Sequence, residues 1–86
     1  MIIGFHKKFI KGYRRLSPKL QEAVDDKIRL FSADPMNETL NNHALTAEYE
    51  CYRSINITGD YRALYRMVSK NEAVFVLIGT HAQIYG

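Results

Sequence analysis

Residues 73–78 read Ala-Val-Phe-Val-Leu-Ile, an unbroken apolar run. A strand that is apolar on both sides belongs in the middle of a sheet, where both of its faces are covered. The polar residues 69–72, Ser-Lys-Asn-Glu, stand directly before it and are typical of a turn. We therefore predict a central strand over residues 73–78 that follows a tight turn from another strand.

Two earlier segments predict a β-hairpin that pairs with this strand. Side chains alternate with a period of two from Tyr49 to Ile57, a second strand is predicted over residues 61–68, and Thr58-Gly59-Asp60 favours a turn between them. Cys51 falls in the first of these strands. A single cysteine has no partner for an internal disulfide, and without a CxxC neighbour it is a poor metal ligand. We expect Cys51 to be a packed, inert strand residue.

Residues 2–35 predict a short strand followed by a helix hairpin. Ile2–Phe5 is β-prone, and four apolar side chains then recur at helical spacing: Phe5, Phe9, Tyr13 and Leu16. Ser17 before Pro18 is typical of the start of a second helix, which Asp34-Pro35 ends. Residues 36–46 show no clear period and predict a connecting loop with room for a short turn of helix.

These elements predict an α+β fold of two layers. The order is β-α-α-β-β-β with a short C-terminal helical turn, and the N-terminal helix hairpin packs on a mostly antiparallel β-sheet. A length of 86 residues suits one domain, 1–86. No apolar run approaches the ~20 residues that span a bilayer, and the first residues lack the positive leader of a signal peptide, so we expect a cytoplasmic protein with no membrane contact.

Charge is distributed unevenly along the chain. The net charge is +3, yet residues 7–29 hold eight basic and three acidic side chains, whereas residues 34–50 hold four acidic and no basic ones. A basic face favours a polyanion such as RNA or DNA, or an acidic protein segment, and a solvated helix surface would give the same pattern. The residues expected on such a face are Lys7, Lys11, Arg53, Arg62 and Arg66.

Residues 79–86 read Gly-Thr-His-Ala-Gln-Ile-Tyr-Gly and follow the central strand directly. His81 and Tyr85 are four positions apart, so on a single helical turn both side chains can face one pocket. His43 and Asp60 stand at the ends of earlier elements. We predict that these four side chains converge in one concave site on the exposed side of the sheet, away from the helix hairpin.

The arrangement of these segments resembles a known family. A helix hairpin is followed by residues 43–45 (His-Ala-Leu), 52–57 (Tyr-Arg-Ser-Ile-Asn-Ile), 59–60 (Gly-Asp), 62–65 (Arg-Ala-Leu-Tyr) and the ending 79–86. In length and order this resembles the RelE/ParE toxin superfamily, and most closely its YafQ-like branch. The resemblance implies the toxin of a type II toxin–antitoxin pair, a ribosome-dependent mRNA endonuclease that a cognate antitoxin neutralises.

Carried over to this sequence, the resemblance implies that His43, Asp60 and His81 transfer protons and that Tyr85 orients or stacks on a base. Cleavage by the 2′-hydroxyl of RNA needs a base, an acid and cations against the charge on the phosphate, but no metal and no cofactor. Histidine suits proton transfer because its pKa lies near neutrality. Arg53, Arg62 or Arg66 is expected to supply the cationic clamp.

Two positions depart from the family pattern. YafQ-like strands commonly carry an aspartate and a histidine two residues apart, where this sequence has Ser54 and Asn56. Asn56 can orient RNA but cannot shuttle a proton near neutral pH. Loss of one general acid or base typically lowers a rate by ~10²- to 10⁴-fold. The alternative is therefore a non-cleaving binding protein of the RelE/ParE fold, either a gyrase poison or an inert antitoxin partner.

Overall fold

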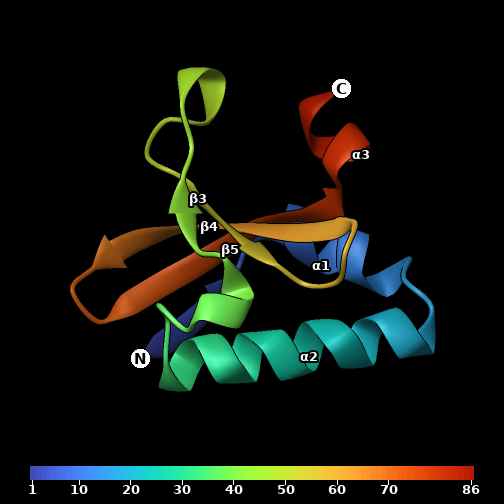
Figure 1. Ribbon diagram of the computed structural model, residues 1–86, viewed down its shortest axis with the longest axis horizontal. Coiled ribbons are helices and arrows are strands. Elements are labelled where there is room, and N and C mark those ends of the chain that lie inside the picture. Colours follow the sequence, from blue (N-terminus) through green and yellow to red (C-terminus); the bar gives the residue numbers. More distant parts are fainter.

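Five strands form one sheet in the order β1-β5-β4-β3-β2 in the computed structural model, which describes residues 1–86 (Figure 1). The strands are β1 (Ile2–Phe5), β2 (His43–Ala44), β3 (Arg53–Asn56), β4 (Tyr61–Ser69) and β5 (Glu72–Thr80). β1 runs parallel to β5, and every other neighbouring pair is antiparallel. The apolar run 73–78 therefore lies in the sheet interior, as its sequence predicts, and the mostly antiparallel sheet is confirmed.

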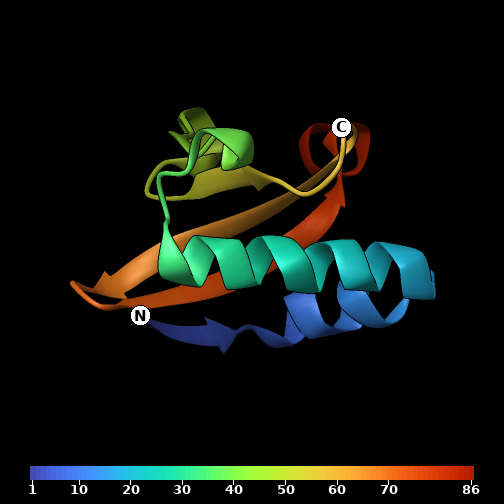
Figure 2. The ribbon, with the colours of Figure 1, turned by 60° about the horizontal axis from the view of Figure 1, so that its bottom comes forward.

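Helices α1 (Lys7–Arg14) and α2 (Pro18–Ala33) form the predicted hairpin and lie on one side of the sheet (Figure 2). Ser17 caps α2 as expected, because its side chain accepts a hydrogen bond from the backbone N–H of Leu20. None of the helices combines the length and apolar character that crossing a membrane requires. The α+β layering predicted from the sequence is confirmed.

The core lies between the sheet and the helix hairpin. The ring of Phe31, on α2, packs at centroid distances of 4.6 Å from Tyr65 and 5.3 Å from Phe75. These three side chains and Ile55 are all buried. Since side chains alternate along a strand, Tyr65, Phe75 and Ile55 fix which face of the sheet meets the helices.

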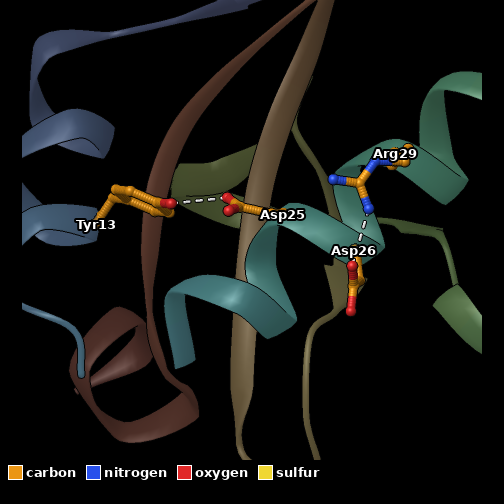
Figure 3. Close-up of polar contacts among 4 residues, drawn as sticks. All are labelled: Tyr13, Asp25, Asp26 and Arg29. Atoms are coloured by element: carbon orange, nitrogen blue, oxygen red, sulfur yellow. Dashed lines mark hydrogen bonds and ion pairs between the residues drawn. The ribbon is translucent and has the colours of Figure 1, made fainter. Parts of the chain in front are cut away.

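One polar contact ties the two helices together. The Tyr13 hydroxyl donates to Asp25 Oδ1 at 2.7 Å (Figure 3). The pKa of Tyr13 is raised because Asp25 accepts this hydrogen bond, and burial and the negative charge of Asp25 act in the same direction. The ion pair between Arg29 and Asp26, with an N–O distance of 2.9 Å, is exposed within α2, where such pairs contribute little to stability.

The segment before β3 differs from the prediction. β3 begins only at Arg53, and residues Ala47–Tyr49 form a 3₁₀ turn, η2. Cys51 is exposed and has a φ of 76°, so it is neither packed nor part of a strand. The alternation therefore begins only at Arg53, and the rings of Tyr49 and Tyr52 meet edge to face at 6.4 Å outside the strand.

The segment from 36 to 46 also holds more structure than expected. The turn of helix for which the sequence left room is η1 (Glu38–Leu40), and it buries Leu40 completely. β2 was not predicted, because two residues are too few to show a period. Through β2, the sheet reaches His43.

Close packing of α1 on β5 depends on Gly12. A Cβ added there would lie 2.9 Å from Ile78 Cγ2 and 3.4 Å from the Ile78 carbonyl oxygen. We expect Gly12→Ala to lower the free energy of unfolding by about 1 kcal/mol, because overpacking costs about 1–3 kcal/mol and the better helix propensity of alanine offsets about 1 kcal/mol. Urea unfolding measures the change.

Gly59→Ala is the matched control, because nothing lies within 4 Å of a Cβ added at Gly59. Its free energy of unfolding should stay within about 0.5 kcal/mol of wild type. A Gly12→Ala protein as stable as wild type would contradict the close approach of α1 to β5.

Candidate active site

The face of the sheet away from α1 and α2, here called the open face, carries the polar strand residues. Ser54 pairs with His43 on β2 and Leu64 on β4, and Asn56 pairs with Arg62. Residues directly opposite each other on paired strands share a face. Since Ile55, between Ser54 and Asn56, belongs to the core, all five of these residues lie on the open face.

A cavity of about 330 Å³ opens on this face. It lies between the segment around β2 and helix α3 (His81–Tyr85), and α3 and the 45–52 segment both stand on the side of the sheet away from α2 (Figure 1). Its lining residues are Asn41, His43, Leu45, Ser54, Arg62, His81 and Tyr85. A larger hollow of about 670 Å³ lies between α1 and α2, but its lining is mainly apolar and contains no histidine, so we place the chemistry in the smaller cavity.

His43 is held in a defined orientation. Its Nδ1 lies 2.8 Å from the carbonyl oxygen of Asn41. A carbonyl oxygen only accepts, so Nδ1 carries the proton of the neutral ring and Nε2 keeps its lone pair. Asn41 has φ 46° and ψ 47°, a left-handed conformation that asparagine adopts more readily than most residues. The local backbone therefore leaves Nε2 of His43 free to accept a proton.

Helix α3 carries the second histidine. Thr80 and Gln83 form a capping box at its start, with the Thr80 hydroxyl accepting from the Gln83 N–H and the Gln83 side chain accepting from the Thr80 N–H. The rings of His81 and Tyr85 lie 4.6 Å apart, as the spacing of four residues predicts. The His81 residue is exposed and lines the cavity, so its ring is accessible to a ligand.

Asp60 is the one predicted catalytic residue that does not line the cavity. It lies in the turn between β3 and β4 and its side chain is exposed. Its backbone carbonyl accepts a hydrogen bond of 3.3 Å from the N–H of His81. The structure thus brings His43, His81 and Tyr85 into one cavity, and it places the Asp60 backbone, rather than its carboxylate, against the start of α3.

The three predicted arginines do not form one cluster. Arg62 lines the cavity, and its guanidinium donates to three carbonyl oxygens of the 58–61 turn, each at 3.1 Å. Arg66 is exposed on the same face, four residues further along β4. Arg53 shares its face with the core residue Tyr65, and its Nε donates to Asn42 Oδ1 at 2.8 Å. Arg53 therefore lies on the helix side of the sheet, apart from Arg62 and Arg66, and its role as an RNA contact stays a prediction.

Lys7 and Lys11 lie on α1, on the other side of the sheet from the cavity (Figure 2). Both side chains are exposed. Basic residues thus occupy two separate surfaces, and Arg62 and Arg66 are the predicted ones on the same face as the two histidines.

Two buried polar atoms on the open face have no partner. Ser54 Oγ and Asn56 Oδ1 make no hydrogen bond, and Ser54 is 1% exposed while lining the cavity. An unpaired buried polar atom costs about 1–3 kcal/mol, and such atoms call for an explanation in a native structure. A ligand that enters the cavity and hydrogen-bonds to Ser54 would remove one of these costs.

No group of three or more His, Cys, Asp or Glu side chains is placed to hold a metal ion. The residues around the cavity therefore offer proton transfer by imidazole and charge compensation by guanidinium, and no metal centre is suggested by their arrangement.

Several solved structures with a similar arrangement are toxins. YafQ from Escherichia coli strain BL21(DE3) aligns over 98% of this chain and 97% of its own, with a TM-score of 0.83 and 18% identity. A YoeB/ParE toxin from Agrobacterium tumefaciens aligns over 94% and 99%, with a TM-score of 0.79 and 20% identity. The chain has the RelE/YafQ-like toxin fold. The toxin–antitoxin complex RelBE2 from Mycobacterium tuberculosis is a further match, over 93% and 96%, with a TM-score of 0.77 and 21% identity.

No protein-family model and no curated protein matches the sequence. The likeness to the RelE/YafQ-like toxins therefore lies in the fold, which the resemblance of the sequence segments also predicted. At identities of 18–21%, the chemistry of the site has to be argued from the residues that this chain itself places there.

The sequence did not single out Asn41 or Tyr49. Asn41 orients His43 through its carbonyl oxygen, and Tyr49 contacts α3 from the η2 turn. Asparagine at a helix end is a weak signal of left-handed backbone. Nothing in the sequence pairs Tyr49 with residues 84 and 85, because that contact exists only after the chain has folded.

The orientation of His43 can be tested by which ring nitrogen carries the proton. In NMR spectra that correlate ring nitrogens with ring protons, neutral His43 should be protonated on Nδ1. His6 is an internal control of opposite expectation, since its Nδ1 accepts from the N–H of Lys8 at 3.1 Å and the proton must then sit on Nε2. Finding both histidines protonated on Nε2 would contradict the Asn41 contact.

Proposed function

We propose that this chain is the toxin of a type II toxin–antitoxin pair, acting in the cytoplasm as a ribosome-dependent endonuclease on messenger RNA. The observation that carries the proposal is the cavity shared by His43 and His81, with Arg62 in its wall. Metal-independent cleavage of RNA requires a general base, a general acid and a cation, and two imidazoles and a guanidinium suit these roles. The similarity in fold to YafQ and to the RelBE2 complex supports the toxin reading.

His43 is the proposed general base. Its Nε2 takes the proton of a ribose 2′-hydroxyl, while the 2′-oxygen attacks the adjacent phosphorus. The bond from phosphorus to the 5′-oxygen of the next nucleotide breaks, and protonated His81 donates a proton to that oxygen. The products are a 2′,3′-cyclic phosphate and a free 5′-hydroxyl, so protons and bonds balance without a further reactant.

The remaining cavity residues have supporting parts in this proposal. Arg62 offsets the charge that grows on the phosphate oxygens. Tyr85, 37% exposed, keeps ring surface available on which a splayed-out base can stack. Asp60 contributes through its backbone contact to His81, and a role for its carboxylate in proton transfer remains a prediction.

The proposed partners are an antitoxin, the ribosome and its messenger RNA. Arg66 on the open face and Lys7 and Lys11 on α1 are exposed cations that suit RNA phosphates or an acidic protein segment. Arg53 is the weakest of the proposed RNA contacts, because Asn42 already holds its guanidinium. Asn56 lies on the same face as Arg62, and its amide is proposed to orient RNA there.

A second candidate function is a binding protein of the same fold that does not cleave RNA. It is favoured by Ser54 and Asn56, which place a hydroxyl and an amide where related strands carry groups that titrate. A gyrase poison or an inert antitoxin partner would need the fold and the basic surfaces but neither histidine.

Cleavage of a defined message on purified ribosomes distinguishes the two functions. His81→Gln should reduce cleavage by ~10²-fold or more, because it removes the proposed general acid while keeping a side chain of similar polarity. His6→Gln is the matched control, since His6 lies at the start of α1 and outside the cavity, and it should cleave as wild type does.

Asn56→His tests the departure from the family pattern. It adds an imidazole on the open face opposite Arg62, and we expect cleavage to rise by up to ~10²-fold. Equal cleavage by wild type and His81→Gln would refute the histidine mechanism. If neither wild type nor Asn56→His cleaves the message on the same ribosomes, the result would favour the non-cleaving binding protein.

A further inference from the structure

Helix α3 is too short to position the cavity residues His81 and Tyr85 without contacts to the rest of the chain. It has five residues, and helices of that length are not stable by themselves in water. It nevertheless carries both His81 and Tyr85, whose positions must be held within fractions of an ångström for efficient proton transfer. The contacts that fasten α3 to the rest of the chain therefore decide how often the site is assembled.

Two of these contacts lie at the start of α3. They are the capping box of Thr80 and Gln83 and the hydrogen bond from His81 N–H to the Asp60 carbonyl. The far end of the helix is fastened differently. There the hydroxyl of Tyr49 donates to the carbonyl oxygen of Ile84 at 2.9 Å, a group that would otherwise belong to the unpaired carbonyls of a helix C-terminus.

Tyr49 also contacts α3 through its ring. It meets the ring of Tyr85 edge to face at 5.6 Å, and Tyr85 in turn lies 4.6 Å from the ring of His81. A continuous set of contacts thus runs from η2 to the proposed general acid. Tyr49 is the residue that connects the 45–52 segment, on one side of the cavity, to α3 on the other.

The backbone around Tyr49 supports a specific role for this contact. Ala47 has φ 56° and Cys51 has φ 76°, so non-glycine residues in the left-handed region stand on both sides of Tyr49. This conformation is unfavourable for residues with a Cβ, and it persists where the surrounding structure over-determines it. The segment 47–51 adopts a strained path, and that path delivers the Tyr49 side chain to α3.

We infer that Tyr49 is a positioning residue: it holds α3, and with it His81, in the arrangement that cleavage requires, without itself touching RNA. This inference rests on the proposed function for its catalytic consequence. Its structural part, the fastening of the C-terminal end of α3, stands independently, because it concerns only contacts within the chain.

Tyr49→Phe removes the hydroxyl and keeps the ring. Loss of one intramolecular hydrogen bond should make the opening of α3 about five-fold more frequent. The amide of Gly86, which donates to the Ala82 carbonyl at 2.8 Å, then exchanges about five-fold faster in NMR measurements. In ribosomal cleavage, kcat should fall by at least about two-fold, because a helix that has lost its C-terminal hydrogen bond holds His81 less precisely even while it is closed, and misplacement of a reacting group by about 1 Å can cost ~10²-fold. KM should stay within about two-fold, because the basic groups that hold RNA are unchanged.

Tyr52→Phe is the matched control. Tyr52 contacts the Tyr49 ring but its hydroxyl makes no hydrogen bond within the chain, so exchange at Gly86 and kcat should both stay as in wild type. Tyr49→Ala removes the ring and the hydroxyl together, so exchange at Gly86 should be faster still and kcat lower still. If the alanine variant does not fold, Tyr49→Phe alone decides the test.

The outcomes separate the inference from the proposed function. Unchanged exchange at Gly86 in Tyr49→Phe overturns the fastening of α3 by Tyr49, whatever happens to cleavage. Faster exchange with unchanged kcat overturns the positioning role. If wild type does not cleave at all, the proposed function fails, and the exchange measurement alone decides whether Tyr49 fastens α3.

Discussion

β5 must be covered on both faces, because its residues 73–78 are apolar throughout. On the lower face in Figure 2, α1 and α2 supply the cover, with α1 approaching so closely that Gly12 has no room for a side chain. On the open face, α3 folds back over Gly79, where a Cβ would lie 3.0 Å from Gln83 Oε1. The element that covers the upper end of β5 is therefore also the element that carries His81 and Tyr85. The same helix therefore both packs against the central strand and forms a wall of the cavity.

The polar groups of the cavity follow from the alternation of β3. Ile55 enters the core, so its neighbours Ser54 and Asn56 must face the other way, toward His43 and Arg62. The same alternation takes Arg53 to the helix side. The positive charge near the histidines therefore comes from Arg62 and Arg66 on β4. Lys7 and Lys11 form a second basic surface on α1, on the other side of the sheet. A partner that covers both surfaces has to pass around the edge of the molecule.

Much of this arrangement could be predicted from sequence periods. The apolar run of β5, the Ser17-Pro18 helix start and the spacing of His81 and Tyr85 are local signals, and each corresponds to what the structure shows. The alternation of Arg53 with Ser54 already contained the information that they occupy opposite faces. The path of residues 47–51 could not be predicted, because positive φ at Ala47 and Cys51 is imposed by tertiary contacts that have no local signature. The roles of Asn41 and Tyr49 were hidden for the same reason.

We propose that the open-face cavity directs a ribose 2′-hydroxyl against the neighbouring phosphate. The most direct test of this proposal is a message in which the single nucleotide before the cleaved bond carries 2′-deoxyribose, translated on purified ribosomes with the wild-type protein. Cleavage at this bond should disappear, whereas a 2′-deoxy substitution one nucleotide further on should leave cleavage intact and yield a 2′,3′-cyclic phosphate end. Continued cleavage at the deoxy-substituted position would contradict the proposal.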